Sequence, residues 1–327
     1  MSQQKTKKKK GTVWKVLLVI LLLLAAAGAA LWDAAASSLY GRITYEETAA
    51  ADGETGQEQD ALRQDGVTNI LLIGNDSREN GEDGRSDAMI LLSISTKTKT
   101  IQMISLLRDT YVEIPGHDGN RLNAAYAFGG PKLLMETIEE NFQIPVSHYV
   151  LVNFEAFANL VDAVGGVDLE LTSEEVEYVN GYLVEYNQLT GRPEGTDYLD
   201  TSLSGLIHLN GPQALAYSRN RYIGTDFART KRQRKVLSAV IGKLPGALVT
   251  NPQEVLDGLL SNLTTNLTKA EFLRLTLDGP KLLTYDLQQG SVPVEGSYQD
   301  ANIRGMAVLE VDFEENIRYL RSRIYGE

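Results

Sequence analysis

The chain has 327 residues, of which 43 are acidic and 31 basic, and it contains no cysteine. The lack of cysteine excludes disulfides, thiol chemistry and cysteine-ligated metal centres. Six of the bases lie before residue 16, so the rest of the chain has 25 bases against 43 acids and a net charge of −18, which argues against nucleic acid as a partner.

The amino terminus predicts a membrane anchor. A basic tail, residues 1–12, precedes an apolar segment, residues 13–33, that is long enough to cross a bilayer core of about 30 Å. Lysines before this segment and acids after it place the tail in the cytoplasm and the remainder outside the cell. A cleaved signal peptide is the alternative, but the apolar run is longer than a typical signal core of about 7–15 residues.

Two further regions follow the predicted anchor. Residues 34–65 are acidic and polar, with few large apolar side chains, which predicts a solvated stalk. Residues 66–327 are expected to form one extracytoplasmic domain, with its motifs concentrated in residues 66–245. A domain of this size can be stabilised by its own hydrophobic core.

The pattern of this domain predicts an α/β fold with a sheet covered by helices on both faces. Strands are predicted at 69–74, 89–95, 101–107, 148–152 and 167–171, with a further strand near 291–294. Helices are predicted from Pro131 onward and at 155–164, 211–221, 229–244, 252–260, 269–277 and 312–323. Residues 172–204 have weak periodicity and are interpreted as an excursion bearing loops.

Aspartate and arginine occur together at three predicted strand edges. These pairs are Asp76 with Arg78, Arg85 with Asp87, and Arg108 with Asp109. Carboxylate oxygens suit Mg²⁺, and arginine forks match phosphate oxygens. One such residue alone is more often part of a turn or a surface pair, but the three pairs together favour a site for a metal-bound phosphate or pyrophosphate.

Residues 217–235 gather seven cations in this acidic chain. A solvated amphipathic helix explains Lys231, Arg234 and Lys235. It explains Arg229, Arg232 and Gln233 less well, because their three- and four-residue spacing places them on one helix face beside the inner apolar stripe. The segment therefore predicts a binding site for a strongly anionic ligand.

Six blocks of sequence resemble the LytR-CpsA-Psr (LCP) family in order and spacing. They are residues 69–78, 84–87, 105–109, 122–130, 161–167 and 209–233. The resemblance implies the LCP fold, a central mixed sheet flanked by helices on both faces, with one transmembrane helix at the amino terminus. It also implies a location on the outer face of a bacterial cytoplasmic membrane, most often in a Gram-positive bacterium.

The activity implied by the resemblance is glycopolymer transfer. Family members move a teichoic acid, capsule or similar polysaccharide from a polyprenyl-pyrophosphate carrier to peptidoglycan and form a phosphodiester. Asp76 and Asp87 would hold Mg²⁺ or Mn²⁺, either one would deprotonate the acceptor hydroxyl, and Arg108 would act with them in catalysis. The residues implied to bind the pyrophosphate are Arg78, Arg85, Arg108, Arg219, Arg221, Arg229 and Gln233.

The family also encloses the lipid tail in an apolar tunnel between sheet and helices. Phe154, Phe157, Leu160 and Val161 are the residues expected to line it, with ordinary core packing as the favoured alternative for each. Two alternative functions remain open at this point. One is a sensor or attenuator that binds lipid-linked intermediates without turnover, and the other is a pyrophosphatase that passes the lipid phosphate to water.

Overall fold

A computed structural model describes residues 37–47, 66–75, 86–260 and 263–327. The predicted anchor, Asp76, Arg78 and Arg85 lie outside these residues, so the anchor stays a prediction. Within the described ranges, no helix combines the length and the hydrophobicity that a bilayer crossing requires.

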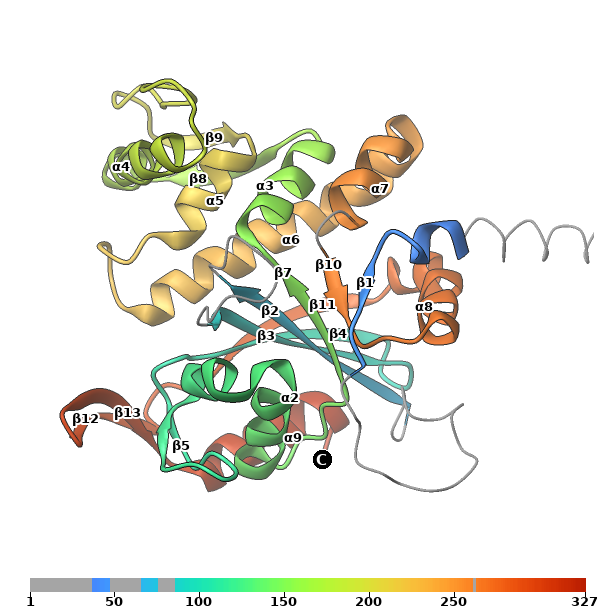
Figure 1. Ribbon diagram of the computed structural model, residues 1–327, viewed down its shortest axis with the longest axis vertical. Coiled ribbons are helices and arrows are strands. Elements are labelled where there is room, and N and C mark those ends of the chain that lie inside the picture. The colour runs from blue at the N-terminus through green and yellow to red at the C-terminus, as the bar shows by residue number, and fades with distance from the viewer. Residues whose placement is uncertain (1–36, 48–65, 76–85, 261–262) are drawn as a thin grey trace, which may run out of the picture.

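The centre of the fold is a seven-stranded mixed sheet (Figure 1). In spatial order its strands are β1 (Thr44–Tyr45), β10 (Leu263–Thr265), β7 (His148–Val152), β2 (Val67–Asn75), β3 (Ser86–Ser95), β4 (Thr100–Leu106) and β11 (Asp286–Val292). β2 is parallel to β7 and antiparallel to β3, and β3 is antiparallel to β4. Residues 70–73 in the middle of β2 are continuously apolar, because helices cover the sheet on both faces.

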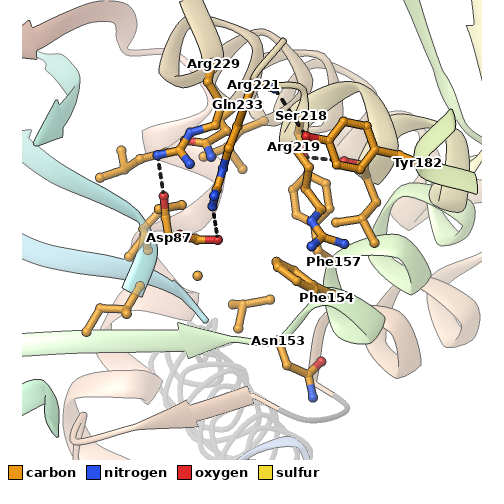
Figure 2. A pocket seen from close by; sticks show the side chains of 18 of the residues that line it. Asp87, Asn153, Phe154, Phe157, Tyr182, Ser218, Arg219, Arg221, Arg229 and Gln233 are labelled. Atoms are coloured by element: carbon orange, nitrogen blue, oxygen red, sulfur yellow. Dashed lines mark hydrogen bonds and ion pairs between the residues drawn. The ribbon is translucent and has the colours of Figure 1, made fainter. Parts of the chain in front are cut away.

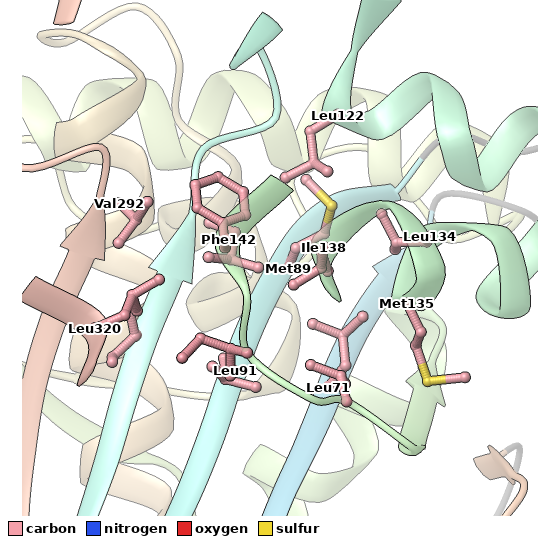
Figure 3. Close-up of a cluster of buried hydrophobic side chains, with 14 of the residues drawn as sticks. Leu71, Met89, Leu91, Leu122, Leu134, Met135, Ile138, Phe142, Val292 and Leu320 are labelled. Atoms are coloured by element: carbon pink, nitrogen blue, oxygen red, sulfur yellow. The ribbon is translucent and has the colours of Figure 1, made fainter. Parts of the chain in front are cut away.

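One face of the sheet is covered by α2 (Leu122–Phe142) and α9 (Phe313–Tyr325) (Figure 1). Figure 3 shows Leu134, Ile138 and Phe142, which lie four residues apart on α2, packed over the strands. Helix α2 contains a break at Gly129 and Gly130, where Gly130 has a φ of 64°. The helix predicted to start at Pro131 is therefore the second half of a longer element.

A second group of helices covers the other face (Figure 1). It comprises α3 (Phe154–Ala163), α4 (Ser173–Leu189), α5 (Gly211–Arg219), α6 (Asp226–Thr250) and α7 (Pro252–Leu260). With the two-stranded sheet of β8 (Val167–Leu171) and β9 (Gly205–Leu209), these helices form a second hydrophobic core. The predicted architecture, a central sheet with helices on both faces, is confirmed.

The smaller elements lie around this framework. Helix α8 (Lys269–Leu282) stands at the sheet edge beside β1 and β10 (Figure 1). The remaining strands form two hairpins, β5 (Tyr111–Val112) with β6 (Asn120–Arg121) and β12 (Tyr298–Ile303) with β13 (Met306–Val311). The second hairpin projects from the body of the molecule (Figure 1).

Three sequence predictions differ from the structure. The loop-bearing excursion is wrong for residues 173–189, because α4 forms a helix that buries Val176, Val179 and Leu183 and carries a capping box with Thr172 and Glu175. Residues 190–204 form turns and loops, as predicted. The strand predicted near 291–294 lies earlier, in β11, and ends before the proline at 293.

The segment predicted to be a stalk also contributes to the fold. Its described part includes β1, which pairs with β10 at the sheet edge. The Glu46 backbone N–H donates to the carbonyl of Thr265, and the hydroxyl of Tyr149 donates to the Glu46 carboxylate. The folded domain therefore begins before residue 66.

Candidate functional site

A cavity of about 510 Å³ lies between the central sheet and helices α3, α5 and α6. Its sheet side is formed at the end of β2 and the start of β3. These two points adjoin because the strands are antiparallel, with Asn75 opposite Ser86 in the register. The prediction that the chain folds back and returns Asp87 to this sheet edge is confirmed.

Asp87 is the centre of a polar cluster at one side of this cavity (Figure 2). Its Oδ1 lies 2.9 Å from Nη1 of Arg108, and its Oδ2 lies 2.6 Å from Nη2 of Arg221. Its backbone carbonyl accepts a hydrogen bond of 3.1 Å from Nη2 of Arg229. Asp87 thus gathers three arginines, which come from the turn after β4, from α6 and from the loop after α5.

Asp226, which was not singled out in the sequence, completes this cluster. It is the first residue of α6, and its Oδ1 lies 2.7 Å from Nη2 of Arg229 and 3.7 Å from Nε of Arg108. Only 2% of the Arg229 side chain is exposed. Burial raises the pKa of Asp226, although the nearby cations Arg229 and Arg108 oppose this shift. The three-residue spacing from Arg229 was the signal available in the sequence.

Two further polar side chains line the cavity with capacity to bind a ligand. The Arg219 guanidinium lies 4.3 Å from the centre of the Phe154 ring and 5.7 Å from that of Tyr182. No ion pair or hydrogen bond from its side chain to a carboxylate is found among the described residues. The buried Oε1 of Gln233 has no hydrogen-bond partner there either. Both were predicted to hold a pyrophosphate, and both lie at the cavity.

The rest of the cavity wall is largely apolar. Its apolar side chains come from the sheet and from helices α3, α5 and α6: Leu72, Ile73, Ala88, Ile90, Val152, Phe154, Phe157, Leu160, Leu215 and Leu237. Phe154, Phe157 and Leu160 therefore line a cavity, which agrees with the predicted apolar tunnel rather than with ordinary core packing. Val161 does not, because it is fully buried in the second hydrophobic core.

The basic segment 217–235 divides into residues that face the cavity and residues that hold the fold. Arg232 pairs with Glu175 at 2.8 Å and donates to the carbonyls of Asn220 and Ile223, so it fixes the loop that carries Arg221. The interpretation of Arg234 as a solvated residue is wrong. It is buried and donates to the Ser105 hydroxyl on β4.

Residues in the predicted excursion also reach the site. Tyr182 and Glu185 of α4 line the cavity, together with Tyr222 from the loop after α5. The hydroxyl of Tyr182 accepts a hydrogen bond of 3.3 Å from the backbone of Arg221. The weak periodicity of the sequence here gave no signal for these positions.

The described residues contain no group of three histidine, aspartate or glutamate side chains arranged to hold a metal ion. Asp87 is nevertheless a suitable hard oxygen ligand, and Mg²⁺ is commonly held by one or two carboxylates and completed by substrate phosphates. The second predicted ligand, Asp76, lies outside the described residues. Arg108 contacts Asp87 but is not among the residues that line the cavity, so it acts on the site through that carboxylate.

The titration of Asp226 gives a prediction about stability. Because its pKa is raised in the folded protein, its contribution to stability is fully present below the ordinary pKa of 3.8 and is lost as the pH rises through the raised value. We expect the free energy of unfolding of the wild type, minus that of Asp226→Asn, to fall as the pH rises above 3.8. Urea unfolding at several pH values measures this difference, and a flat or rising difference would contradict the prediction.

The fold and the site together define an α/β protein with an arginine-rich anion site beside an apolar cavity. The chain belongs to the LytR_cpsA_psr family, whose sequence pattern matches residues 37–319. It is 38% identical over 215 residues to the polyisoprenyl-teichoic acid–peptidoglycan teichoic acid transferase TagU of Enterococcus faecalis. That match covers 64% of each chain, so slightly less than two thirds of the relative is spanned.

Solved structures of the family have the same fold. TagT bound to LI-WTA matches with a TM-score of 0.65 and 27% identity, over 86% of this chain and 98% of that chain. The family protein YwtF (TagT) with bound octaprenyl pyrophosphate lipid matches with a TM-score of 0.61 and 26% identity, over 85% of this chain and all of that chain. The resemblance found in the sequence is thereby confirmed.

Proposed function

We propose that the protein transfers a glycopolymer from a polyprenyl-pyrophosphate carrier to peptidoglycan. The observation that carries this proposal is the position of the arginine cluster directly beside an apolar cavity. A pyrophosphate attached to a long apolar chain needs both surfaces at once. The relatives named as teichoic acid transferases and the family structure with a bound octaprenyl pyrophosphate support the same ligand.

The reaction moves one phosphoryl group with its glycan. A hydroxyl oxygen of peptidoglycan attacks the phosphorus that bears the glycan, the bridging P–O bond breaks, and polyprenyl phosphate leaves. The new bond is a phosphodiester, and the hydroxyl proton passes to Asp87 or Asp76. Arg219, Arg221 and Arg229 offer cations to the pyrophosphate oxygens and to the charge that develops on the leaving phosphate.

Gln233 and Asp87 add to this arrangement. The amide of Gln233, whose oxygen is unpartnered among the described residues, can bind the acceptor hydroxyl or a phosphate-bound water. Asp87 and Asp76 would hold Mg²⁺ or Mn²⁺ together with the substrate phosphates. Such an ion would neutralise phosphate charge and polarise the phosphorus–oxygen bond.

The proposal includes the location of the chain. The apolar segment 13–33 would anchor it in the cytoplasmic membrane with the amino terminus inside and the catalytic domain outside. Both substrates, the membrane-held carrier and peptidoglycan, are found on that side. Nucleic acid is not a partner in this proposal, since the chain beyond the basic tail is strongly acidic.

A reconstituted reaction tests the proposed function. The full chain in detergent is incubated with a polyprenyl-pyrophosphate-linked disaccharide, Mg²⁺ and nascent peptidoglycan, and attached sugar and released lipid phosphate are both measured. Attachment of sugar to peptidoglycan with release of one polyprenyl phosphate per sugar is the expected result. Lipid phosphate without attachment would instead establish a pyrophosphatase, and binding without turnover a sensor.

The apolar cavity gives a second prediction. Val152, at the end of β7, lines the cavity, and tryptophan at this position would fill space that the prenyl chain requires. We expect Val152→Trp to weaken binding of a long polyprenyl pyrophosphate by about tenfold or more, because the ring and the lipid cannot share the volume. Binding of inorganic pyrophosphate should be unchanged.

Isothermal titration with both ligands makes this comparison. Val249→Trp is a matched control, because Val249 is 83% exposed near the carboxyl end of α6 and does not line the cavity. Equal losses for the long lipid and for inorganic pyrophosphate would show that Val152 does not border the lipid path.

A further inference from the structure

Helix α8 is unusual among the long helices of this fold. It spans 14 residues, contains five large apolar side chains, and has no buried residue. Leu273, Leu277 and Pro280 follow one another at four- and three-residue spacing, so they form one apolar stripe. Leu277 is 62% exposed, and Leu283, directly after the helix, is 51% exposed. The described part of the chain therefore provides no surface that covers this apolar stripe.

The first described residues of the chain lie against this helix. The ring of Tyr40 lies 5.6 Å from that of Phe272 on α8, and its hydroxyl donates to the carbonyl of Leu267 at 2.9 Å. The chain then continues into β1, which pairs with β10, the strand that leads into α8. Figure 1 shows residues 37–47, in blue, beside α8 at this edge of the sheet.

Chain length limits how far this edge can lie from the membrane. The predicted membrane segment ends at residue 33, and the first described residue is 37. Four peptide links span at most about 15 Å, whatever their conformation. Residue 37 therefore lies within about 15 Å of the end of the membrane segment, and α8 packs beside the residues that follow it.

The charge of α8 suits a membrane surface better than most of the chain does. Residues 269–284 contain three basic and two acidic side chains, in a protein whose net charge is −12. The basic residues Lys269 and Lys281 are exposed. Amphipathic helices that lie on a bilayer combine an apolar face with lysine and arginine beside it, which favours anionic lipids.

We propose that α8 is a membrane-docking helix that lies on the outer surface of the bilayer, with Leu277 and Leu283 in the lipid. This rests on the membrane anchor of the proposed function. The anchor and α8 give the domain two points of attachment on one edge, the β1 and β10 edge of the sheet. Two attachments fix the orientation of the domain relative to the membrane, whereas a single flexible tether leaves it free to rotate.

Site-directed fluorescence tests this docking, and the absence of cysteine from the chain makes labelling specific. Single-cysteine variants of the full chain, Leu277→Cys and Leu283→Cys, are labelled with an environment-sensitive dye. Each is reconstituted into vesicles of phosphatidylglycerol and phosphatidylethanolamine, with or without lipids brominated in the acyl chain. Leu206→Cys on β9 is the control, because Leu206 is 69% exposed and β9 lies away from α8 (Figure 1).

Brominated lipids are expected to quench the dye at positions 277 and 283 at least about twofold and to leave the dye at position 206 unchanged. Washing the vesicles with alkaline carbonate tests the anchor separately, because it removes proteins that do not span the bilayer. If the chain stays in the vesicles after this wash but position 277 is quenched no more than position 206, the docking of α8 is wrong and the membrane anchor is retained. If the wash releases the chain, both the membrane anchor and the docking of α8 are wrong. Neither result bears on transfer chemistry, which the reconstituted reaction measures separately.

Discussion

Replacing Asp87 by asparagine is expected to lower kcat for glycan transfer by about 10²–10³-fold. This carboxylate holds Arg108 and Arg221 with its two oxygens and is a proposed ligand of the metal ion. An amide has one acceptor oxygen and no charge, so it cannot order both arginines or hold a cation equally well. The arginines would then lose the geometry in which they face the transferred phosphate.

The affinity for the lipid should respond differently from kcat. Removing a negative charge beside an anion site favours anion binding, so the Kd for polyprenyl pyrophosphate measured without Mg²⁺ should stay equal or fall. Single-turnover kinetics and titration separate the two quantities. Asp118→Asn is the matched control, because Asp118 is 84% exposed and pairs with Arg304 on a surface hairpin. A change in kcat of less than threefold for Asp87→Asn would refute its role.

Replacing Arg229 by methionine is expected to destabilise the fold by about 3–5 kcal/mol at neutral pH. The Arg229 side chain is 2% exposed, pairs with Asp226 at 2.7 Å and donates to the Asp87 carbonyl. Methionine keeps much of the volume, but among the described residues it leaves the partly buried Asp226 carboxylate with Arg108, at 3.7 Å, as its one ion-pair partner. Burying a charge without a close partner costs far more than the ion pair contributes in the wild type.

Urea unfolding followed by far-UV circular dichroism measures this loss. Arg318→Met is the control, since Arg318 is 70% exposed in an i,i+4 pair and should change stability by no more than about 0.5 kcal/mol. Adding Asp226→Asn to Arg229→Met should restore part of the lost stability, because the unpaired charge is then gone. If the double variant loses as much free energy of unfolding as the two single variants added together, this explanation is wrong.

The two results together distinguish two functions of the arginines. Arg221 and Arg219 face the cavity and are available to the ligand, whereas Arg229 also forms part of the protein interior. Arg232 and Arg234 are structural, because their donors bind the loop carbonyls, Glu175 and Ser105. The basic segment 217–235 thus contains residues available to the ligand and residues that hold these in position.

Much of the fold could be predicted from periodicity. The strands at residues 69–74 and 148–152 and the helix at 155–164 all form close to their expected positions. Their apolar runs match the period of one element, and tertiary packing agrees with that local preference. Helix α4 was missed because its buried stripe has three apolar residues and ends in Asn187, while apolar Val184 lies on the exposed side. The strand at 167–171 was found, but pattern alone gave no reason to pair it with β9 outside the central sheet.

The sequence predicted the chemistry of the site, an arginine-rich anion site, but only some of the residues that form it. The sequence singled out Arg219, Arg221, Arg229 and Gln233, and all four line the cavity. It did not single out Asp226, and it assigned Arg234 to solvent. Helical spacing shows which residues share one face of a helix, but it does not show which other residues pack against that face. Here the partner of Arg234 is Ser105, 129 residues away.

The sequence by itself determined the local elements, the concentration of cations in residues 217–235 and the family resemblance, because these depend on neighbouring residues and their order. Only the tertiary structure decided which cations meet which carboxylates and which side chains border the cavity. Asp87 and Arg221 are separated by 134 residues and lie 2.6 Å apart. Such a contact depends on the strand register and on helix packing over the sheet, where long-range burial outweighs local preference.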